Sequence, residues 1–239
     1  MKSALGFDPR DIPWTTPQGE WPALPQDWLM PDRLQSVFAN PPDWTPELQR
    51  ETSFSQRPPK EAAVLIPIVQ RGSLGSEPHL LLTQRTMNLS THAGQIAFPG
   101  GKVDDSDTSV VAAALREAEE EVGLSSAFVK VLGTMPKYIT GTAFHITPVV
   151  GLVSQAHVIQ ANAHEVESVF EVPLSFLMNP ANHRLHQWER DGVTRQWYSM
   201  PYHEQPASTN SQVNERFIWG ATAGMIRNFY RFLLAANSL

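Results

Sequence analysis

Short apolar runs rich in β-branched residues recur along the chain after residue 60, and Gly, Pro or Ser bounds each of them. Runs of this kind are typical of buried strands. They predict strands over 62–69, 79–85, 128–135, 144–153 and 166–174. A hairpin is predicted over 183–200, where Asp191-Gly192 supplies the positive φ angles of a two-residue turn. The polar run 203–215 is predicted to be a loop.

Three other stretches repeat their apolar residues at helical spacing. A short helix is predicted over 31–39, where proline suits the first position. A second helix begins at Asp107, Thr108 or Ser109 and ends at Gly123, which suits a left-handed C-cap. The apolar face of the second helix comprises Val111, Leu115, Ala118 and Val122. An amphipathic C-terminal helix is also predicted, and its apolar face comprises Thr222, Met225, Ile226, Phe229 and Leu233. Strands and helices together predict a mixed fold, α/β in the broad sense and α+β in detail.

The chain changes character near residue 60, which divides it into an N-terminal extension, 1–60, and a main domain, 61–239. Eleven of the 20 prolines and four of the seven tryptophans precede Lys60. Proline disfavours long regular elements, and tryptophan is costly to leave in water, so Trp14, Trp21, Trp28 and Trp44 are expected to pack on the main domain. We expect a strap without chemistry; the alternative is a subunit contact in a homodimer.

The 239 residues include 24 acidic and 18 basic side chains, and the formal net charge is −6. This charge disfavours nucleic-acid and anionic-membrane partners and leaves a small-molecule substrate as the expected partner. The absence of cysteine excludes disulfides, thiolate metal sites and cysteine nucleophiles. Apolar runs are shorter than a membrane span, and the first ten residues lack the apolar core of a secretory signal, so we expect a cytoplasmic protein.

Glutamates gather on one side of the predicted helix before Gly123. Glu117, Glu120 and Glu121 lie three or four residues apart, a spacing at which like charges repel. A hard divalent cation such as Mg²⁺ would offset this repulsion, because it prefers carboxylate oxygens. The alternative is a solvated acidic face helped by Arg116. A glycine pair before the helix, where the backbone can approach a ligand closely, favours the metal site.

The segment 100–124 resembles the Nudix box, whose pattern is GX5EX7REUXEEXGU with U an apolar residue. Residues 116–124, REAEEEVGL, match the second half at every position. In the first half Asp107 stands where glutamate is usual, and eight residues instead of seven separate it from Arg116, so Asp107 is not expected to bind metal. So many fixed positions make the match far more specific than a glycine pattern alone.

An upstream motif resembles the coenzyme A pyrophosphatase branch of this family, LLT-x-R-[SA]-x3-R-x3-G-x3-FPGG. Residues 81–83, Arg85, Gly94 and 98–101 stand in register with it. Thr86 replaces the small residue, and Ser90 stands where arginine is usual, so one phosphate contact of the branch is not expected here. Further segments that resemble the branch extend the likeness over about 62–234; they are 147–151, 164–174 and 219–227.

The resemblance implies a Nudix fold, a mixed β-sheet sandwiched between α-helices. It also implies a Mg²⁺- or Mn²⁺-dependent hydrolase that cleaves coenzyme A or its thioesters to adenosine 3′,5′-bisphosphate and 4′-phosphopantetheine or its acyl form. Cleavage of an anionic diphosphate needs charge neutralisation and an in-line water, which metal on carboxylates supplies. The alternatives are a Nudix diphosphatase acting on NADH, ADP-ribose or another dinucleotide, and a catalytically silent Nudix module that binds a nucleotide.

The resemblance also implies roles for single residues of the box. Glu117 and Glu121 are the expected metal ligands, and Glu120 is a further ligand or the group that orients water. A backbone carbonyl at Gly100 or Gly101 completes the coordination sphere.

The remaining candidates lie on both sides of the glutamates. Arg116 is expected to fix a glutamate by a bidentate pair. The general base is Glu120 or Glu165. The expected phosphate and nucleotide contacts are Arg85, His92 and Lys102, and more weakly Lys137, although Arg85 could instead form a surface ion pair and His92 a structural hydrogen bond. Phe98 and Trp219 are expected to be packing residues.

Overall fold

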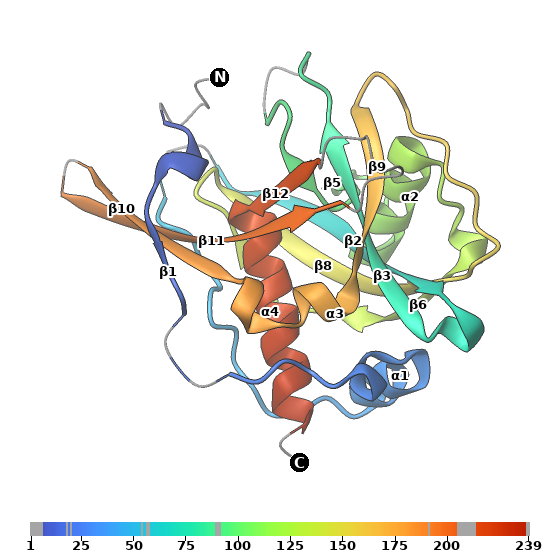
Figure 1. Ribbon diagram of the computed structural model, residues 1–239. Helices are drawn as coiled ribbons and strands as arrows, with labels where there is room; N and C mark the ends of the chain where they lie inside the picture. Colours follow the sequence, from blue (N-terminus) through green and yellow to red (C-terminus); the bar gives the residue numbers. More distant parts are fainter. Residues whose placement is uncertain are drawn as a thin grey trace.

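The structure is a computed structural model that describes residues 7–17, 19, 21–53, 55, 58–88, 92–190, 192–204 and 214–237. Within these residues the chain forms two β-sheets and four α-helices (Figure 1). Short 3-10 helices lie at Pro9–Asp11, Gln26–Leu29, Ser73–Gly75, Ser126–Phe128 and Pro180–Asn182.

The larger sheet is mixed and carries the box. Its central path is, in order, β4 (Ile96–Ala97), β3 (Glu77–Arg85), β2 (Lys60–Arg71), β8 (Phe144–Val153) and β6 (Val129–Thr134). Three strands lie off this path: β5 (Gly100–Lys102) pairs with β2, β7 (Tyr138–Ile139) with β8, and β9 (Val166–Pro173) with β3. Only the β2–β8 pair is parallel among the described strands. The five predicted strands after residue 60 are therefore confirmed.

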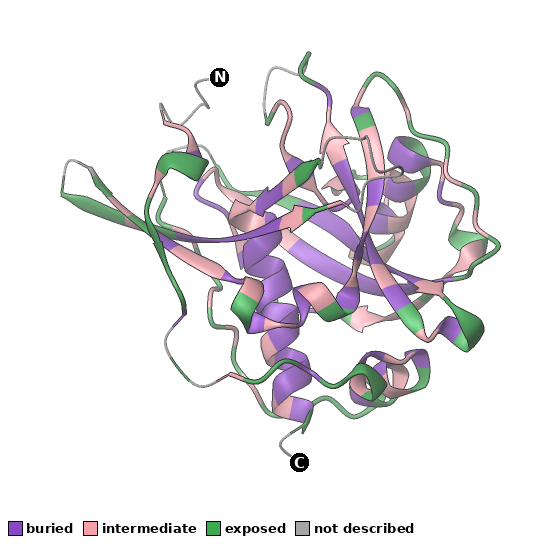
Figure 2. Ribbon diagram, viewed as in Figure 1, coloured by how far each residue is buried: buried purple, intermediate pink, exposed green. Residues whose placement is uncertain are grey.

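Helices cover both faces of this sheet. Residues of β2 alternate between two cores: Ala63 and Leu65 pack with the buried face of α2 (Val110–Val122), whereas Val64 and Ile66 pack with α4 (Gly220–Asn237). Figure 2 shows the buried residues gathered on the central strands and along α4. The predicted sandwich of a mixed sheet between helices is confirmed.

The second sheet covers the far side of α4. It orders β1 (Trp14–Thr15), β10 (Arg184–Arg190), β11 (Val193–His203) and β12 (Glu215–Trp219), all antiparallel. Thirteen of the 18 residues of α4 are buried as a result. The predicted C-terminal helix is present and its predicted apolar face is buried. The helix is less amphipathic than predicted, because packing from two sides leaves α4 little polar face.

The hairpin β10–β11 is confirmed. Gly192 has a φ of 72°, as the predicted turn requires, and Asp191 lies outside the described residues. The predicted loop 203–215 is shorter than expected, because His203 and Glu215 pair across β11 and β12. Its stretch 205–213 lies outside the described residues.

The N-terminal extension contributes to the core. Helix α1 (Pro31–Ala39) has the predicted bounds, and it buries Leu34 and Val37 in the same cluster as α4. Trp21, Trp28 and Trp44 pack against that cluster as expected. Trp14 does not: it is 48% exposed on the edge strand β1, with the Arg184 guanidinium 4.5 Å from its ring. The division at residue 60 stays a prediction.

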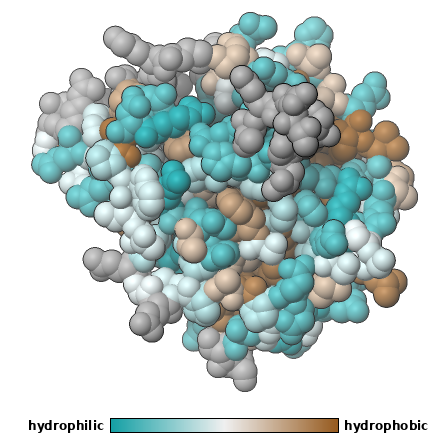
Figure 3. All heavy atoms as spheres, in the orientation of Figure 1, coloured by the Kyte–Doolittle hydropathy of each residue, from teal (hydrophilic) through white to brown (hydrophobic). Residues whose placement is uncertain are grey.

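One face of the surface can be followed by its hydropathy. Most of the face seen in Figure 3 is hydrophilic, and hydrophobic residues gather in a few small areas. None of the described helices is long and apolar enough to cross a membrane.

Candidate active site

The glycine segment at the start of the box is fixed by the sheet. Gly100 and Gly101 pair with Val64 and Ala63 of β2, and the Leu65 amide donates to the Pro99 carbonyl at 2.9 Å. Gly100 has a φ of +157°, and a Cβ there would lie 2.4 Å from the Ala63 carbonyl oxygen. Only glycine fits this position, so the sheet sets where the backbone of the segment runs.

Helix α2 brings the glutamates to this segment. The Ser109 hydroxyl caps its start by accepting from the Ala112 amide, and Gly123 ends it in the left-handed conformation predicted for it. The three glutamates do not share one environment, because Glu121 is buried, Glu117 is partly buried and Glu120 is exposed. The predicted single acidic face is thus divided by burial.

Glu121 is the most enclosed carboxylate of the cluster, with 3% of the residue exposed. It accepts from the Gly100 amide at 3.2 Å and from Arg85 Nη1 at 3.3 Å. Burial raises the pKa of Glu121 to about 7 despite these two donors, and the charges of Glu117 and Glu165 push it in the same direction. A carboxyl with this pKa gives up its proton readily to a cation that takes its place.

Glu117 lies directly over Gly101. A Cβ on Gly101 would come 2.3 Å from Glu117 Oε1, so glycine makes room for this carboxylate. Burial raises the pKa of Glu117, Arg116 lowers it, and the charges of Glu120 and Glu165 raise it further. The charge of Glu165 raises the pKa of both glutamates, and its predicted role as general base stays a prediction.

Arg116 fixes the start of the box, although its partners differ from the prediction. Its bidentate pair is with Asp107, from Nε to Oδ1 at 3.0 Å and from Nη2 to Oδ2 at 2.9 Å, and not with a glutamate. Its Nη1 makes single bonds to Glu117 at 3.2 Å and Glu120 at 3.0 Å, and Nη2 also donates to the Lys102 carbonyl at 3.2 Å. The sequence showed Asp107 as a departure from the box pattern but did not show that Arg116 would pair with it.

These residues fit a hard divalent cation. Glu117 and Glu121 offer carboxylate oxygens one helical turn apart, both against the Gly100–Gly101 segment, and a Cβ on Gly101 would fill the space that Glu117 occupies. Burial and like charge raise the pKa of both carboxyls, and a cation would offset both effects.

The side chains are not gathered around one point as they stand. Within the described ranges, no group of three or more His, Asp and Glu side chains is arranged to hold a metal ion. Glu120 is exposed and paired with Arg116. The metal-binding roles of Glu117, Glu120, Glu121 and Gly101 therefore stay a prediction.

The predicted phosphate contacts have mixed positions. Arg85 lies in the cluster, where it pairs with Glu121, and its buried Nε meets no hydrogen-bond partner in the described part of the chain. Lys102 is exposed on β5 beside the glycine segment. His92 has a φ of 57° and its Nδ1 lies 2.8 Å from Gln95 Oε1. Lys137 is paired with Glu61 at 2.8 Å and does not join the cluster. Ser90, where the branch has arginine, lies outside the described residues.

Glu120 and Glu165 both stay candidates for the general base. Glu165 precedes β9, and its carbonyl accepts from the Thr86 amide at 3.0 Å, which ties the start of β9 to the end of β3. Glu120 is held by Arg116 on the exposed side of α2. Phe98 is buried in the α4 core as predicted, and Trp219 is partly buried at the end of β12.

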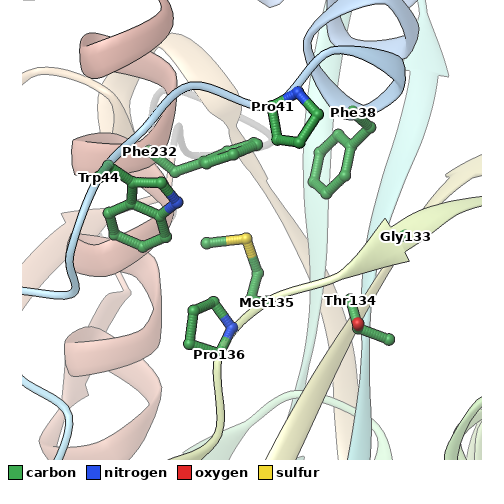
Figure 4. A pocket seen from close by; sticks show the side chains of 8 residues that line it. All are labelled: Phe38, Pro41, Trp44, Gly133, Thr134, Met135, Pro136 and Phe232. Atoms are coloured by element: carbon green, nitrogen blue, oxygen red, sulfur yellow. The ribbon is translucent and has the colours of Figure 1, made fainter.

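A hollow of about 390 Å³ lies elsewhere, where α1, the end of β6 and α4 meet (Figure 4). Its lining is mostly apolar and aromatic: Phe38, Pro41, Trp44, Gly133, Thr134, Met135, Pro136 and Phe232. None of the candidate site residues lines it.

The chain is similar to proteins of one known family. The family described as "NUDIX domain" matches residues 59–215, more than half of the chain. "Uncharacterized Nudix hydrolase NudL" of Escherichia coli O6:H1 is 45% identical over 183 residues, which cover 76% of this chain and 85% of that protein. The protein of the same name from Shigella boydii serotype 18 is 44% identical over the same shares.

Solved structures of related proteins show lower similarity. An Ap4A hydrolase of C. elegans, in a binary complex, has a TM-score of 0.40 and 20% identity, covering 48% of this chain and 80% of that one. A MutT/nudix family protein of Enterococcus faecalis has a TM-score of 0.44 and 16% identity, covering 74% and 63%. The family match and the identity to the NudL proteins, together with the box geometry, lead to one conclusion: the chain belongs to the Nudix hydrolase family, beside its NudL relatives.

Proposed function

We propose that the protein hydrolyses the diphosphate bond of coenzyme A, or of its thioesters, with Mg²⁺ or Mn²⁺. One observation supports this most strongly. The upstream motif that resembles the coenzyme A branch and the box helix meet at one carboxylate, because Arg85 and the Gly100 amide of that motif both donate to Glu121. The upstream motif is typical of the coenzyme A branch, and it contacts one of the glutamates proposed to bind metal. It can therefore influence which diphosphate compound is cleaved.

Each residue of the site has a proposed role that follows from its position. Glu117 and Glu121 hold a divalent cation against the glycine segment, and Arg116 fixes Glu117 and Glu120 relative to the loop through Asp107. Arg85 brings a positive charge to the buried side of the cluster, where it pairs with Glu121 and adds to the attraction for an anionic diphosphate. Glu120 or Glu165 accepts a proton from the attacking water.

A divalent metal held by Glu117 and Glu121 would neutralise charge on the diphosphate and would make a water easier to deprotonate. The chain holds no cysteine and needs no covalent nucleophile for this reaction. His92 and Lys102, on either side of the glycine segment in sequence, are the proposed further contacts to substrate phosphates.

The test is product analysis with the full-length protein. Coenzyme A, acetyl-coenzyme A, NADH and ADP-ribose are incubated separately with Mg²⁺ and with Mn²⁺, using Glu121→Gln as the inactive variant. Glu119→Gln is the matched control, since Glu119 is an exposed glutamate of the same helix. Adenosine 3′,5′-bisphosphate from the coenzyme A tubes, with the wild type and Glu119→Gln but not with Glu121→Gln, supports the proposal.

Two other outcomes contradict it in different ways. Turnover of NADH or ADP-ribose alone keeps the hydrolase chemistry and rejects coenzyme A as the substrate. No turnover of any compound with either metal favours a catalytically silent module that binds a nucleotide.

A further inference from the structure

A carboxylate of the N-terminal extension lies inside the main domain. Residues 49–51 run beside β7: the Ile139 amide donates to the Gln49 carbonyl and the Glu51 amide to the Ile139 carbonyl, both at 2.8 Å. Arg50 and Ile139 form a parallel bridge. The extension thus adds a short strand segment to the larger sheet at β7.

The Glu51 side chain joins β7 to the connection between β7 and β8. It accepts from the Tyr138 hydroxyl at 3.0 Å and from the Gly141 amide at 2.8 Å. Tyr138 and Gly141 are both buried. Burial raises the pKa of Glu51, which agrees with a carboxyl group that faces inward. A side chain of the extension therefore bonds directly to the backbone of the loop 140–143.

This loop is held in a strained form. Ala143 has a φ of 68°, a left-handed conformation that is unfavourable for alanine. The Thr140 hydroxyl accepts from the Phe144 amide at 3.0 Å, and the Ala143 amide donates to the Thr140 carbonyl at 3.1 Å. Non-glycine residues in this region persist only where their surroundings hold them, and such residues cluster at functional sites.

The loop lies at the same end of β2 as the start of the box. The Lys60 amide donates to the Ala143 carbonyl at 2.9 Å. Glu61, the next residue of β2, accepts from the Val103 amide through its backbone carbonyl at 3.1 Å. In the register of the sheet, Phe144 pairs with Lys60 and Lys102 pairs with Ala62, so the loop and the end of β5 lie on either side of the same stretch of β2. The loop 140–143 and the start of the box are thus neighbours at one end of the sheet.

We propose that Glu51 is a positioning residue, which holds the loop 140–143 as a wall of the substrate site on the side of Lys102. The inference rests on the proposed diphosphatase function, because it assigns the loop to that same site. The glutamates of the box act on the reacting diphosphate, whereas this wall contacts the part of the substrate that does not react. Its loss therefore weakens substrate binding and leaves the chemical step in place.

The test compares Glu51→Ala and Glu51→Gln with the wild type. Tyr230→Phe is the matched control, since the Tyr230 hydroxyl donates to the Pro22 carbonyl and its loss removes an extension contact away from this loop. For Glu51→Ala we expect KM to rise about tenfold, which corresponds to about 1.4 kcal/mol, with kcat within about twofold. Glu51→Gln keeps an acceptor for the Gly141 amide and recovers most of the loss. Tyr230→Phe leaves KM unchanged.

A second readout does not depend on turnover. Amide hydrogen exchange at Gly141 and Phe144 should become faster in Glu51→Ala and stay unchanged in Tyr230→Phe. Equal kinetics for Glu51→Ala and Tyr230→Phe, or exchange that accelerates throughout the chain instead of at the loop, would overturn the inference. If the wild type cleaves another dinucleotide, the KM comparison is made with that compound. If it cleaves none, the proposed function fails and the exchange at the loop alone decides the positioning role.

Discussion

Glu121→Gln should stabilise the metal-free protein at alkaline pH, although it removes a residue of the proposed active site. Glu121 is 3% exposed, and burial raises its pKa from 4.5 to about 7. At about 1.4 kcal/mol per pH unit, this increase corresponds to roughly 3 kcal/mol. The folded protein bears this cost whenever Glu121 is ionised without a cation, and an uncharged glutamine does not bear it.

The sign of the pH dependence follows from which state holds the proton. The folded carboxyl keeps its proton up to about pH 7, whereas the unfolded one loses it near 4.5. The folded state thus binds more protons between these values, and its stability falls as pH rises through that window. Glutamine does not titrate, so the stability of the variant relative to the wild type should increase by roughly 3 kcal/mol between about pH 4.5 and about pH 8.

The assay is urea unfolding of both proteins in the presence of a chelator, repeated across this pH window. Effects of other titrating groups cancel in the difference between the two proteins. Glu119→Gln, on the exposed side of the same helix, should show no comparable trend. A stability difference that stays flat or shrinks as pH rises would refute the reasoning. Added Mg²⁺ or Mn²⁺ should stabilise the wild type and not Glu121→Gln.

Four further substitutions test other parts of the structure. Gly101→Ala places a Cβ 2.3 Å from Glu117 Oε1, so turnover should fall at least about tenfold. Glu117→Gln should lose most of the metal-dependent turnover. Circular dichroism should show that both variants are folded. Asp107→Asn removes the bidentate partner of Arg116 and should lower kcat more than it raises KM in steady-state kinetics. Leu34→Ala truncates a fully buried side chain of the extension and should cost about 2–5 kcal/mol in urea unfolding, whereas a cost below about 0.5 kcal/mol would mean that α1 is only loosely attached.

Local patterns predicted most of the fold because they depend on neighbouring residues only. The bounds of α1 follow from a proline at its first position, and α2 ends at Gly123 because only a left-handed residue fits there. The box predicted the glutamate cluster for the same reason, since spacing along one helix fixes which side chains lie near one another. Burial was not predicted, because it depends on β2 and the glycine segment packing against α2 from elsewhere in the chain.

The partners of charged residues could not be predicted from such patterns. Arg116 pairs with Asp107, from which eight residues of loop and helix separate it, and the spacing along the helix gave no reason to prefer Asp107 over a glutamate. The contact of Arg85 with substrate stays a prediction, and the sequence gave no sign that Arg85 would pair with Glu121, 36 residues later. This pair depends on how the end of β3 packs beside α2, which spacing along the chain does not show.

The sequence of the extension predicted little of its structure, and its residues contact residues that are far away along the chain. Arg227 of α4 is 1% exposed, and it bonds to Glu47 of the extension at 2.9 Å and to His183 Nδ1 at 3.2 Å. His183 Nε2 donates to the Leu177 carbonyl, and burial lowers the pKa of His183 to about 4, so the imidazole stays neutral and accepts from the guanidinium. A buried charge is costly unless it is paired, so Arg227 requires Glu47 in place. The extension is therefore part of the folded unit, which is why one of its carboxylates, Glu51, can be positioned precisely enough to shape a substrate site.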